Sequence, residues 1–315
     1  MAQQKSSPSG RRRGSDGARR IGSSLAGLAR KRVREGTRKA AEASLSRARE
    51  IGDGARRALA SDGLPIPYIS VLRAPKGRAS LAKIGRTVRV ASYNVHRWAG
   101  FNGRGKPDFD LAGKVIGALN ADVIALQEVL RPSGREDLLE ALAEDLGLHL
   151  VFAANRIHKR GELGNAILSR FPMNSVSVLD LFSSRFERRC ALAAGFNTGS
   201  GVFGVVATHL SLVDRTRHRQ VEMLLDHPQW NAGPAVLLGD MNAWRDCKAS
   251  KSLEKGLHRH NNVEWPATFP SSRPILALDR IYASSAEVVS VRAHDTPAAR
   301  RASDHLPVIA RIRLE

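Results

Sequence analysis

The stretch AVLLGDMNA, residues Ala235–Ala243, decides the fold, because an apolar run of strand length ends directly in polar side chains. A run of Ala, Val and Leu closed by glycine is typical of a strand buried on both faces. Asp240 and Asn242 follow it at the point where such a strand ends. Taken alone, Asp-x-Asn after a strand is commonly a turn or a helix cap. The same arrangement of an apolar run followed by polar residues recurs along the chain, and this recurrence makes a functional role more plausible than a simple turn.

On both sides of this stretch, from Arg86 onward, short apolar runs alternate with helical patterns. Runs rich in Val, Ile and Leu with turn-forming residues at their ends are typical of strands. They occupy residues 87–95, 122–129, 165–170, 201–212, 235–240, 278–284 and 306–314. Apolar residues at helical spacing occupy residues 110–120, 135–147 and 214–227. The alternation predicts stacked sheets flanked by helices.

Polar residues of similar chemistry stand at nearly every predicted strand end. The pairs are Asn94 with His96, Gln127 with Glu128, Thr208 with His209, Asp240 with Asn242, Asp279 with Arg280, and Asp304 with His305. Each pair alone has an ordinary explanation, such as a turn, a solvated strand end, a satisfied histidine or a loop ion pair. Strand ends in layered α/β folds, however, meet at one edge of a sheet. The conjunction of these pairs therefore predicts one shared cleft.

The side chains of that cleft suit a hard divalent cation and a phosphate group. Mg²⁺ prefers carboxylate and amide oxygens. The sequence offers such oxygens at Glu128, Asp304, Asp240, Asn94 and Asn242. Phosphodiester hydrolysis also requires a positioned water and donors for the phosphate oxygens, which His209, His305 and Asn242 can supply. The sequence predicts a hydrolase of phosphodiester bonds that depends on Mg²⁺ or Mn²⁺, and it leaves the exact substrate open.

Seven segments resemble the motifs of the endonuclease/exonuclease/phosphatase superfamily. They are SYNVH (92–96), IALQEV (124–129), GNAILSRFP (164–172), ATHLSL (207–212), LLGDMNA (237–243), LDRIYAS (278–284) and SDHLPV (303–308). The likeness covers residues 86–315 and is strongest to the sphingomyelinase-like and small bacterial phosphodiesterase branch. It implies an α/β four-layer sandwich, with two mixed β-sheets packed face to face and helices on the outside. It also implies a metal-dependent phosphoesterase site at one edge.

The same resemblance implies roles for the polar residues. Glu128 becomes the principal metal ligand, with Asn94 and Asp304 nearby. Asp240 positions or deprotonates the attacking water.

For the phosphate group, the resemblance implies that Asn242 and His209 hold its oxygens. His305, oriented by Asp279, acts on the scissile phosphate as a base or as an electrostatic partner. Two further side chains predicted to line the cleft and contact substrate are Asn165 and His96.

Departures from the family pattern bear on the substrate. His96 stands where repair-type endonucleases often carry an acidic or amide residue, and long basic insertions for gripping duplex DNA are absent from the sequence. One alternative function is a DNA or RNA endonuclease or exonuclease. Another is a catalytically silent module that binds nucleic acid or membrane, which is less favoured because Glu128, Asp240 and His305 are all retained.

Residues 1–62 form a basic, Arg-rich extension, predicted to be disordered or a weakly amphipathic helix with an alanine face. The net charge of +20 favours polyanionic partners, so the extension is either a solvated arm or a tether to an anionic membrane surface or nucleic acid. Residues 63–85, with three prolines, are predicted to be a linker, and residues 86–315 the catalytic domain.

Two cysteines, Cys190 and Cys247, are too far apart in the sequence to suggest a disulfide framework or a zinc site. They fit a reducing compartment. No apolar run is long enough for a spanning helix. We therefore expect a monomer located in the cytoplasm, with peripheral membrane attachment as the alternative.

Overall fold

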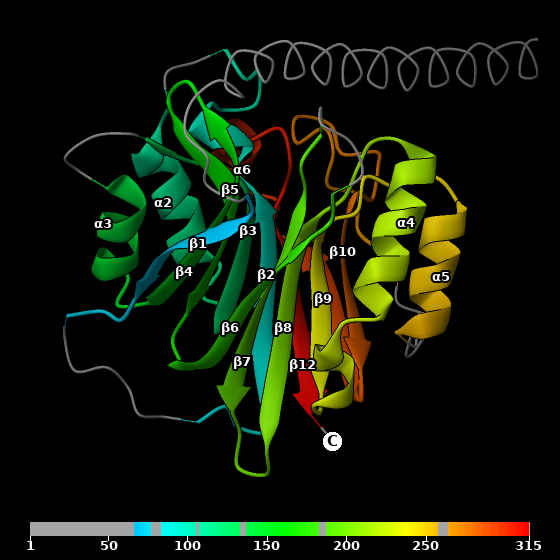
Figure 1. Ribbon diagram of the computed structural model, residues 1–315. Helices are drawn as coiled ribbons and strands as arrows, with labels where there is room; N and C mark the ends of the chain where they lie inside the picture. The colour runs from blue at the N-terminus through cyan, green and yellow to red at the C-terminus, as the bar shows by residue number, and fades with distance from the viewer. Residues whose placement is uncertain are drawn as a thin grey trace, which may run out of the picture. The chain divides into compact units, whose positions relative to one another are not determined.

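The computed structural model describes residues 66–76, 83–104, 107–132, 137–182, 187–257 and 264–314. Within these ranges the strands form two mixed sheets, and the helices lie on their outer sides (Figure 1). This confirms the predicted α/β sandwich. The basic extension 1–62 and its predicted helix lie outside the described residues.

The larger sheet has seven strands in the described part of the chain, in the spatial order β1-β4-β5-β3-β2-β12-β11. Only β2 and β3 pair in parallel there, so the sheet is mixed. The strands are β1 (Tyr68–Arg73), β2 (Thr87–Asn94), β3 (Val123–Pro132), β4 (His149–His158), β5 (Gly161–Ser169), β11 (Ala286–Ala293) and β12 (Val308–Leu314).

The smaller sheet has five strands among the described residues, in the order β10-β9-β8-β7-β6. Its parallel pair is β8 with β9, and the other neighbours are antiparallel. The strands are β6 (Met173–Asp180), β7 (Cys190–Asn197), β8 (Val202–His209), β9 (Ala235–Asp240) and β10 (Asp279–Ser284).

Five α-helices and two short 3₁₀ helices complete the described elements. They are α2 (Phe109–Ala118), α3 (Leu138–Asp145), α4 (Asp214–Leu225), α5 (Lys248–Gly256), α6 (Pro297–Ala302), η1 (His96–Trp98) and η2 (Pro228–Asn231). Figure 1 shows α2 and α3 on one side of the sheets and α4 and α5 on the other. None of these described helices has the length and apolar character needed to cross a bilayer.

Three hydrophobic clusters separate the four layers. The first packs the larger sheet against α2, α3 and α6 and includes Ile116. The second lies between the two sheets, where Val90 of β2 and Val236 of β9 are both fully buried. The third packs Leu237 of β9 against helices that include Leu224 of α4. Burial on both faces explains why the central strands are nearly continuous apolar runs.

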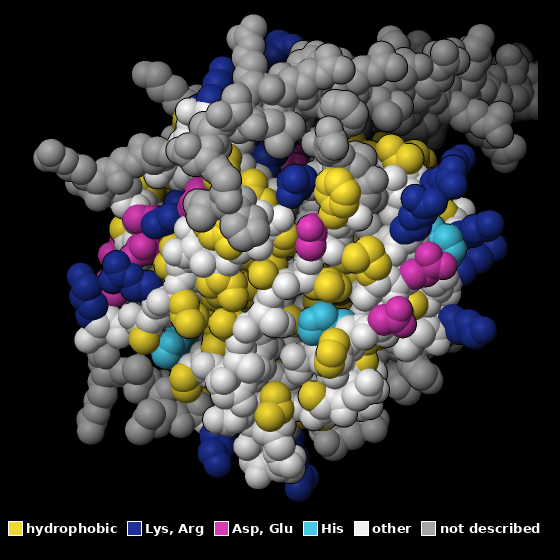
Figure 2. Space-filling view, viewed as in Figure 1, with side chains coloured by type: hydrophobic (Ala, Val, Ile, Leu, Met, Phe, Trp, Pro, Cys, Tyr) yellow, Lys and Arg dark blue, Asp and Glu magenta, His cyan; other side chains and the backbone are white. Residues whose placement is uncertain are grey.

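Strand β2 shows how the sequence divides between these layers. Its side chains alternate along the strand, as the pleat of a β-strand requires. Val88 and Val90 enter the cluster between the sheets, whereas Ala91 and Tyr93 enter the cluster under the helices. Figure 2 shows hydrophobic side chains on the central part of the described surface in this view, with Lys and Arg mostly toward its margins.

The segment predicted as a linker contributes a strand, which corrects the domain boundary. Tyr68–Arg73 pair antiparallel with β4 as strand β1 at the edge of the larger sheet. The prolines that suggested a linker, Pro67 and Pro75, flank this strand and do not interrupt it. Proline at the ends of an edge strand removes no ladder hydrogen bond, so it is compatible with the sheet.

Several elements were not predicted. Strands β4, β6, β7 and β11 and helices α5 and α6 carry no clear pattern in the sequence. β7 is rich in alanine and glycine, which have low strand propensity, and it is a strand because it is buried between β6 and β8. Tertiary packing therefore decides this part of the smaller sheet.

Candidate active site

The strand register brings the predicted polar residues to one edge. Asn94 at the end of β2 stands opposite Gln127 of β3. In the smaller sheet Asp240 at the end of β9 is paired with His209 of β8 on one side and with Asp279 of β10 on the other. The predicted convergence of strand ends is therefore present in the backbone.

Asp240 is the hub where the two sheets meet. Its Oδ2 accepts a hydrogen bond from Asn94 Nδ2 at 3.1 Å, and its Oδ1 accepts one from the backbone N–H of Asn242 at 2.9 Å. The Nε2 atoms of His209 and His305 lie 3.3 Å and 3.7 Å from Oδ2. Burial raises the pKa of Asp240 to about 6, although the charge of His305 opposes this. A buried carboxylate with a raised pKa is suited to accept a proton.

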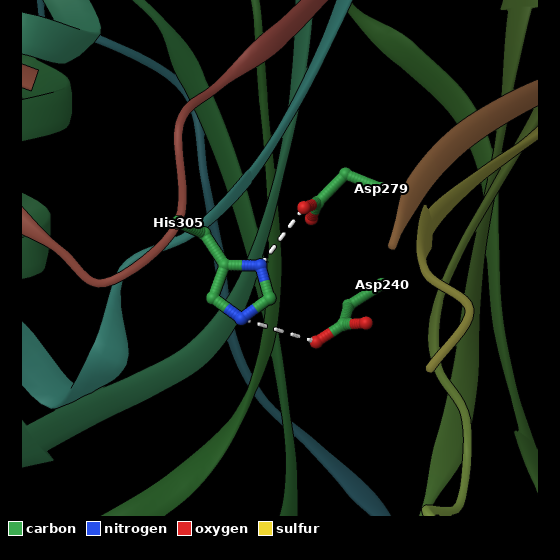
Figure 3. A group of neighbouring side chains, drawn as sticks. All are labelled: Asp240, Asp279 and His305. Carbon is green, nitrogen blue, oxygen red and sulfur yellow. Dashed lines mark hydrogen bonds and ion pairs between the residues drawn. The ribbon is translucent and has the colours of Figure 1, made fainter. Parts of the chain in front are cut away.

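His305 lies between two carboxylates, as Figure 3 shows. Its Nδ1 is 2.8 Å from Asp279 Oδ2, which also accepts a hydrogen bond of 2.6 Å from the Thr268 hydroxyl. The ring of Phe269 packs on the imidazole with centroids 4.9 Å apart. Burial lowers the pKa of His305, but the charges of Asp279 and Asp240 outweigh burial and raise that pKa to about 10. His305 is therefore an imidazolium at neutral pH.

His209, in contrast to His305, is a neutral imidazole. Its Nδ1 lies 2.8 Å from Nη1 of Arg189, and a guanidinium can only donate hydrogen bonds. Nδ1 must therefore accept, and the proton of the neutral ring sits on Nε2, the atom that faces Asp240. Burial, followed by the charge of Arg189, lowers the pKa of His209 well below its usual value. Arg189 is itself fixed by an ion pair of 3.0 Å with Glu187.

Asn242 takes a different contact from the one expected. Its backbone is in the left-handed region, with φ 49°, and its side-chain NH₂ donates to the carbonyl oxygen of Leu210 at 2.9 Å. The residue thus ties the loops after β8 and β9 together beside Asp240. Its contact with a phosphate oxygen stays a prediction.

Glu128 projects from a bulge in β3. The pairing of β3 with β5 shifts register between Leu126 and Val129, and Glu128 has φ 51°. Burial favours a higher pKa for Glu128, but the nearby positive charge of Arg97 outweighs it and holds the pKa below its usual range. The side chain is therefore a carboxylate.

Asn165 lies on β5 opposite this bulge, since the neighbouring residues of β5 pair with Leu126 and Val129. Its buried side-chain NH₂ donates to the carbonyl oxygen of Cys190 at 3.0 Å. The structure places Asn165 beside the bulge and uses its NH₂ to join the two sheets. Its contact with substrate stays a prediction.

The turn after β2 presents two basic side chains to the acids of the larger sheet. His96, Arg97 and Trp98 all have positive φ angles, of 46°, 56° and 63°. Nδ1 of His96 lies 3.2 Å from Oδ1 of Asp304, and Nε of Arg97 lies 3.6 Å from Oε2 of Glu128. Arg97 Nη2 is also 3.0 Å from His96 Nε2. His96 thus contacts Asp304, a predicted metal ligand, and its contact with substrate stays a prediction.

Anchors hold this unusual turn. Trp98 is fully buried, and its Nε1 donates to the carbonyl oxygen of Leu130 at 2.7 Å. A Cβ atom on Gly103 would lie 2.7 Å from Cε1 of His96, so the loop requires glycine there. The backbone thus fixes where His96 and Arg97 point.

Three residues that contact the candidate site were not predicted from the sequence. Arg189 orients His209, Arg97 neighbours Glu128, and Thr268 binds Asp279. Arg97 directly follows the SYNVH motif, and Arg189 lies in the basic run before β7. Thr268 has no signal in the sequence, because only the fold brings it to the buried carboxylate.

Two sets of side chains could hold a metal ion. Among the described residues, Asp240, Asp279 and His305 have potential ligand atoms within 4.8 Å of one another. One ligand of that group is an imidazole nitrogen, which Mg²⁺ prefers less than oxygen ligands, and Oδ1 of Asp279 in it is buried without a hydrogen-bond partner. The second set is Glu128, Asn94 and Asp304, which offers only oxygen ligands of the kind preferred by Mg²⁺. The chemistry of the second set fits a hard cation better.

An α/β sandwich with acids, amides and histidines gathered at one edge has the form of a phosphoester hydrolase. The chain belongs to the Endonuclease/Exonuclease/phosphatase family, whose model matches residues 92–305. This confirms the predicted superfamily. The chain is also 29% identical over 252 residues to a protein of Escherichia coli strain K12 named Uncharacterized protein YbhP. The match covers 72% of this chain and 96% of that one.

Solved structures share the fold. An endonuclease/exonuclease/phosphatase from Beutenbergia cavernae superposes with a TM-score of 0.59 at 24% identity, covering 73% of this chain and 72% of that one. The Bacteroides thetaiotaomicron mannosyl-6-phosphatase Bt3783 gives a TM-score of 0.53 at 17% identity, covering 71% and 99%. A humanized D. rerio TDP2 gives a TM-score of 0.54 at 14% identity, covering 72% of this chain and 99% of that one. These likenesses show the fold, and the family membership supports phosphoester hydrolysis.

Proposed function

We propose that this protein is a phosphodiesterase that depends on Mg²⁺ or Mn²⁺ and hydrolyses its substrate by attack of water at phosphorus. The observation that carries the proposal is the position of Asp240. This buried carboxylate lies beside two histidines, of which His305 is cationic and His209 is neutral. Asp240 can take a proton, His305 carries positive charge, and His209 is a neutral donor. Hydrolysis of a phosphoester requires these three properties together.

Asp240 orients and deprotonates the attacking water. Its raised pKa makes it a stronger base than a solvated aspartate while it remains ionised near neutral pH. The hydrogen bonds from Asn94 and Asn242 fix both carboxylate oxygens, so the direction of proton transfer is set before substrate arrives.

The two histidines stabilise the charge that develops on the phosphate oxygens. His305 contributes a full positive charge, and Asp279 fixes the orientation of its ring through Nδ1. His209 contributes an Nε2–H donor without charge. Such fixed donors in a buried site are stronger than they would be in water.

Glu128, Asn94 and Asp304 would hold the cation. Glu128 lies on β3, Asn94 on β2 and Asp304 in the loop before β12. These three strands are neighbours in the larger sheet. When bound there, Mg²⁺ or Mn²⁺ supplies Lewis-acid stabilisation of a phosphoryl oxygen. The ionised state of Glu128 fits this role.

The experiment is hydrolysis of a soluble bis-aryl phosphodiester by the purified full chain with Mg²⁺ or Mn²⁺. We expect chelation to abolish the activity and His305→Gln to lower kcat by about 10²–10³-fold, the range for loss of one fixed donor to the charge of the transition state. His218→Gln on the surface of α4 is the matched control and should retain activity. Activity that survives both the chelator and His305→Gln would contradict the proposal.

Three further properties are proposals that rest on the sequence: the cytoplasmic location, the monomeric state, and the binding of the basic extension to anionic membrane or nucleic acid. They do not enter the mechanism above. A nuclease activity is the alternative outcome of a substrate screen, in which plasmid DNA or RNA would be cleaved in preference to other diesters.

A further inference from the structure

Large exposed hydrophobic side chains gather at the edge that carries the candidate site. Seven such residues occur in the described ranges, and two of them, Leu72 on β1 and Met223 on α4, lie elsewhere. The other five expose between 39% and 53% of their surface. They form a set that we call the apolar rim: Phe101, Phe182, Val213, Trp244 and Ile275.

Two members of the rim are tied to the loops around His305. The backbone N–H of Phe101 donates to the carbonyl oxygen of Arg301 at 3.2 Å, shortly before the Asp304–His305 pair. The N–H of Ile275 donates to the carbonyl oxygen of Phe269, whose ring packs on His305. Both side chains are thus exposed beside the loops that hold His305.

The remaining members follow strands of the smaller sheet. Val213 comes four residues after His209, and Trp244 comes two residues after Asn242. The ring of Trp244 packs against the guanidinium carbon of buried Arg217, 5.7 Å from the ring centroid. Phe182 follows β6, whose carboxyl end lies at the same edge as that of β8 because β7 runs antiparallel to both. Five separate loops therefore contribute apolar side chains at one edge.

Arginines are interspersed with this rim. Exposed arginines lie within three residues of most rim members or bind their backbone: Arg104, Arg215, Arg245, Arg273 and Arg301. Arg245 is paired with Asp214, so it contributes less free charge than the others. In Figure 2 the upper part of the described surface carries yellow side chains next to dark-blue ones.

We propose that the apolar rim is a docking surface for an anionic lipid membrane, which would present lipid-borne phosphodiesters to the site. Apolar side chains that insert below the headgroups, next to cations that meet anionic lipid, are the features of interfacial binding. The net charge of +20 complements such a surface. A nucleic-acid backbone is bound mainly through phosphate contacts and would gain nothing from exposed Val213 and Ile275. The lipid substrate class rests on the proposed phosphodiesterase function.

Trp244 provides a direct test in the full chain. With vesicles of equal parts phosphatidylcholine and phosphatidylglycerol, we expect its fluorescence to shift to shorter wavelength as the ring leaves water. Trp244→Phe should remove the shift, and the fully buried Trp98 should contribute none. Vesicle binding without any shift would show attachment through other residues and would overturn the proposal. So would a shift caused by a short DNA duplex and not by vesicles.

A matched pair of double variants tests the rest of the rim. Phe101→Ser with Ile275→Ser should weaken vesicle binding about a hundredfold, because burial of each large apolar side chain is worth roughly tenfold in affinity. Leu72→Ser with Met223→Ser removes two large exposed hydrophobic side chains elsewhere, 59% and 37% exposed, and should change binding little. Both proteins retain residues 1–62, so attraction by the basic extension cancels in the comparison. Equal binding by the two double variants would overturn the docking surface.

Hydrolysis of the soluble bis-aryl diester separates this inference from the proposed function. The rim variants should keep that activity, since Phe101 and Ile275 are about half exposed and neither is a candidate site residue. Active protein that fails to bind vesicles overturns the docking surface alone. Vesicle binding without hydrolysis of the soluble diester or of any phospholipid in the vesicles overturns the phosphodiesterase and with it the lipid substrate.

Discussion

The ends of the two sheets meet at one edge, but the negative charge of their acidic side chains is neutralised by different basic partners. In the smaller sheet Asp240 and Asp279 flank the imidazolium of His305. In the larger sheet Glu128 and Asp304 face Arg97 and His96, which come from a separate turn. His305 joins the two acids of the smaller sheet, through a hydrogen bond to Asp279 and an ion pair with Asp240. The larger-sheet acids rely on basic side chains that a cation could replace.

This difference suggests a division of labour. On the proposed mechanism, the smaller-sheet end handles the water and the proton, and the larger-sheet end would hold the cation. The turn that carries His96 and Arg97 is consistent with a specific role, since three successive non-glycine residues with positive φ cost roughly 1–2 kcal/mol each. Strain of this kind persists where the surrounding structure fixes it, here through Trp98.

The largest loss of activity is expected when an acid of the smaller sheet is replaced. Asp240→Asn should lower kcat on a bis-aryl diester by about 10²–10⁴-fold, because the base is lost. Raising the Mn²⁺ concentration should not restore the rate, since the cation ligands remain. Steady-state kinetics across a Mn²⁺ series measure this, and Asp145→Asn on the surface of α3 serves as the control. Recovery at high Mn²⁺ would place Asp240 among the metal ligands.

The next effect breaks the larger-sheet group. Glu128→Gln should weaken cation binding by about 100-fold, at the upper end of the losses seen when a metal site loses a supporting group. Activity should then recover as Mn²⁺ is raised, in contrast to Asp240→Asn. Calorimetric titration with Mn²⁺ gives the affinity directly. Unchanged affinity would mean that Glu128 holds no cation.

Much of this comparison could be predicted from the sequence, because each acid follows an apolar strand or lies beside one. Asn94, Glu128 and Asp240 were identified from strand ends alone. The charge states could not be predicted, since they depend on contacts between strands. Arg189 lies twenty residues before His209, and only the antiparallel pairing of β7 and β8 brings them together.

The neutral state of His209 gives a smaller expected effect. Arg189→Met should lower kcat about tenfold, which corresponds to one charge-assisted hydrogen bond. Arg189→Lys should restore part of the loss. Long-range ¹⁵N NMR of histidine-labelled protein should show the Nε2–H form of His209 in the parent, and a mixture of tautomers in Arg189→Met. A pure Nε2–H form in both would leave Arg189 without an orienting role.

The smallest effect concerns the contact between Arg97 and Glu128. Removing a partly exposed ion pair is worth at most about 1 kcal/mol, so Arg97→Met should tighten Mg²⁺ binding no more than about fivefold. Arg104→Met, on the same loop and exposed, should leave the affinity unchanged. Calorimetric titration with Mg²⁺ distinguishes the two. Weaker binding in Arg97→Met would mean that Arg97 supports the cation site and does not compete for it.

The most direct test locates the ion. Crystals of the full chain grown with Mn²⁺ allow the cation to be found by its anomalous scattering. We predict one strong peak bounded by Glu128, Asp304 and Asn94, with His305 still hydrogen-bonded to Asp279 and ion-paired with Asp240. A peak between Asp240, Asp279 and His305, with none beside Glu128, would contradict the division of labour between the two sheets.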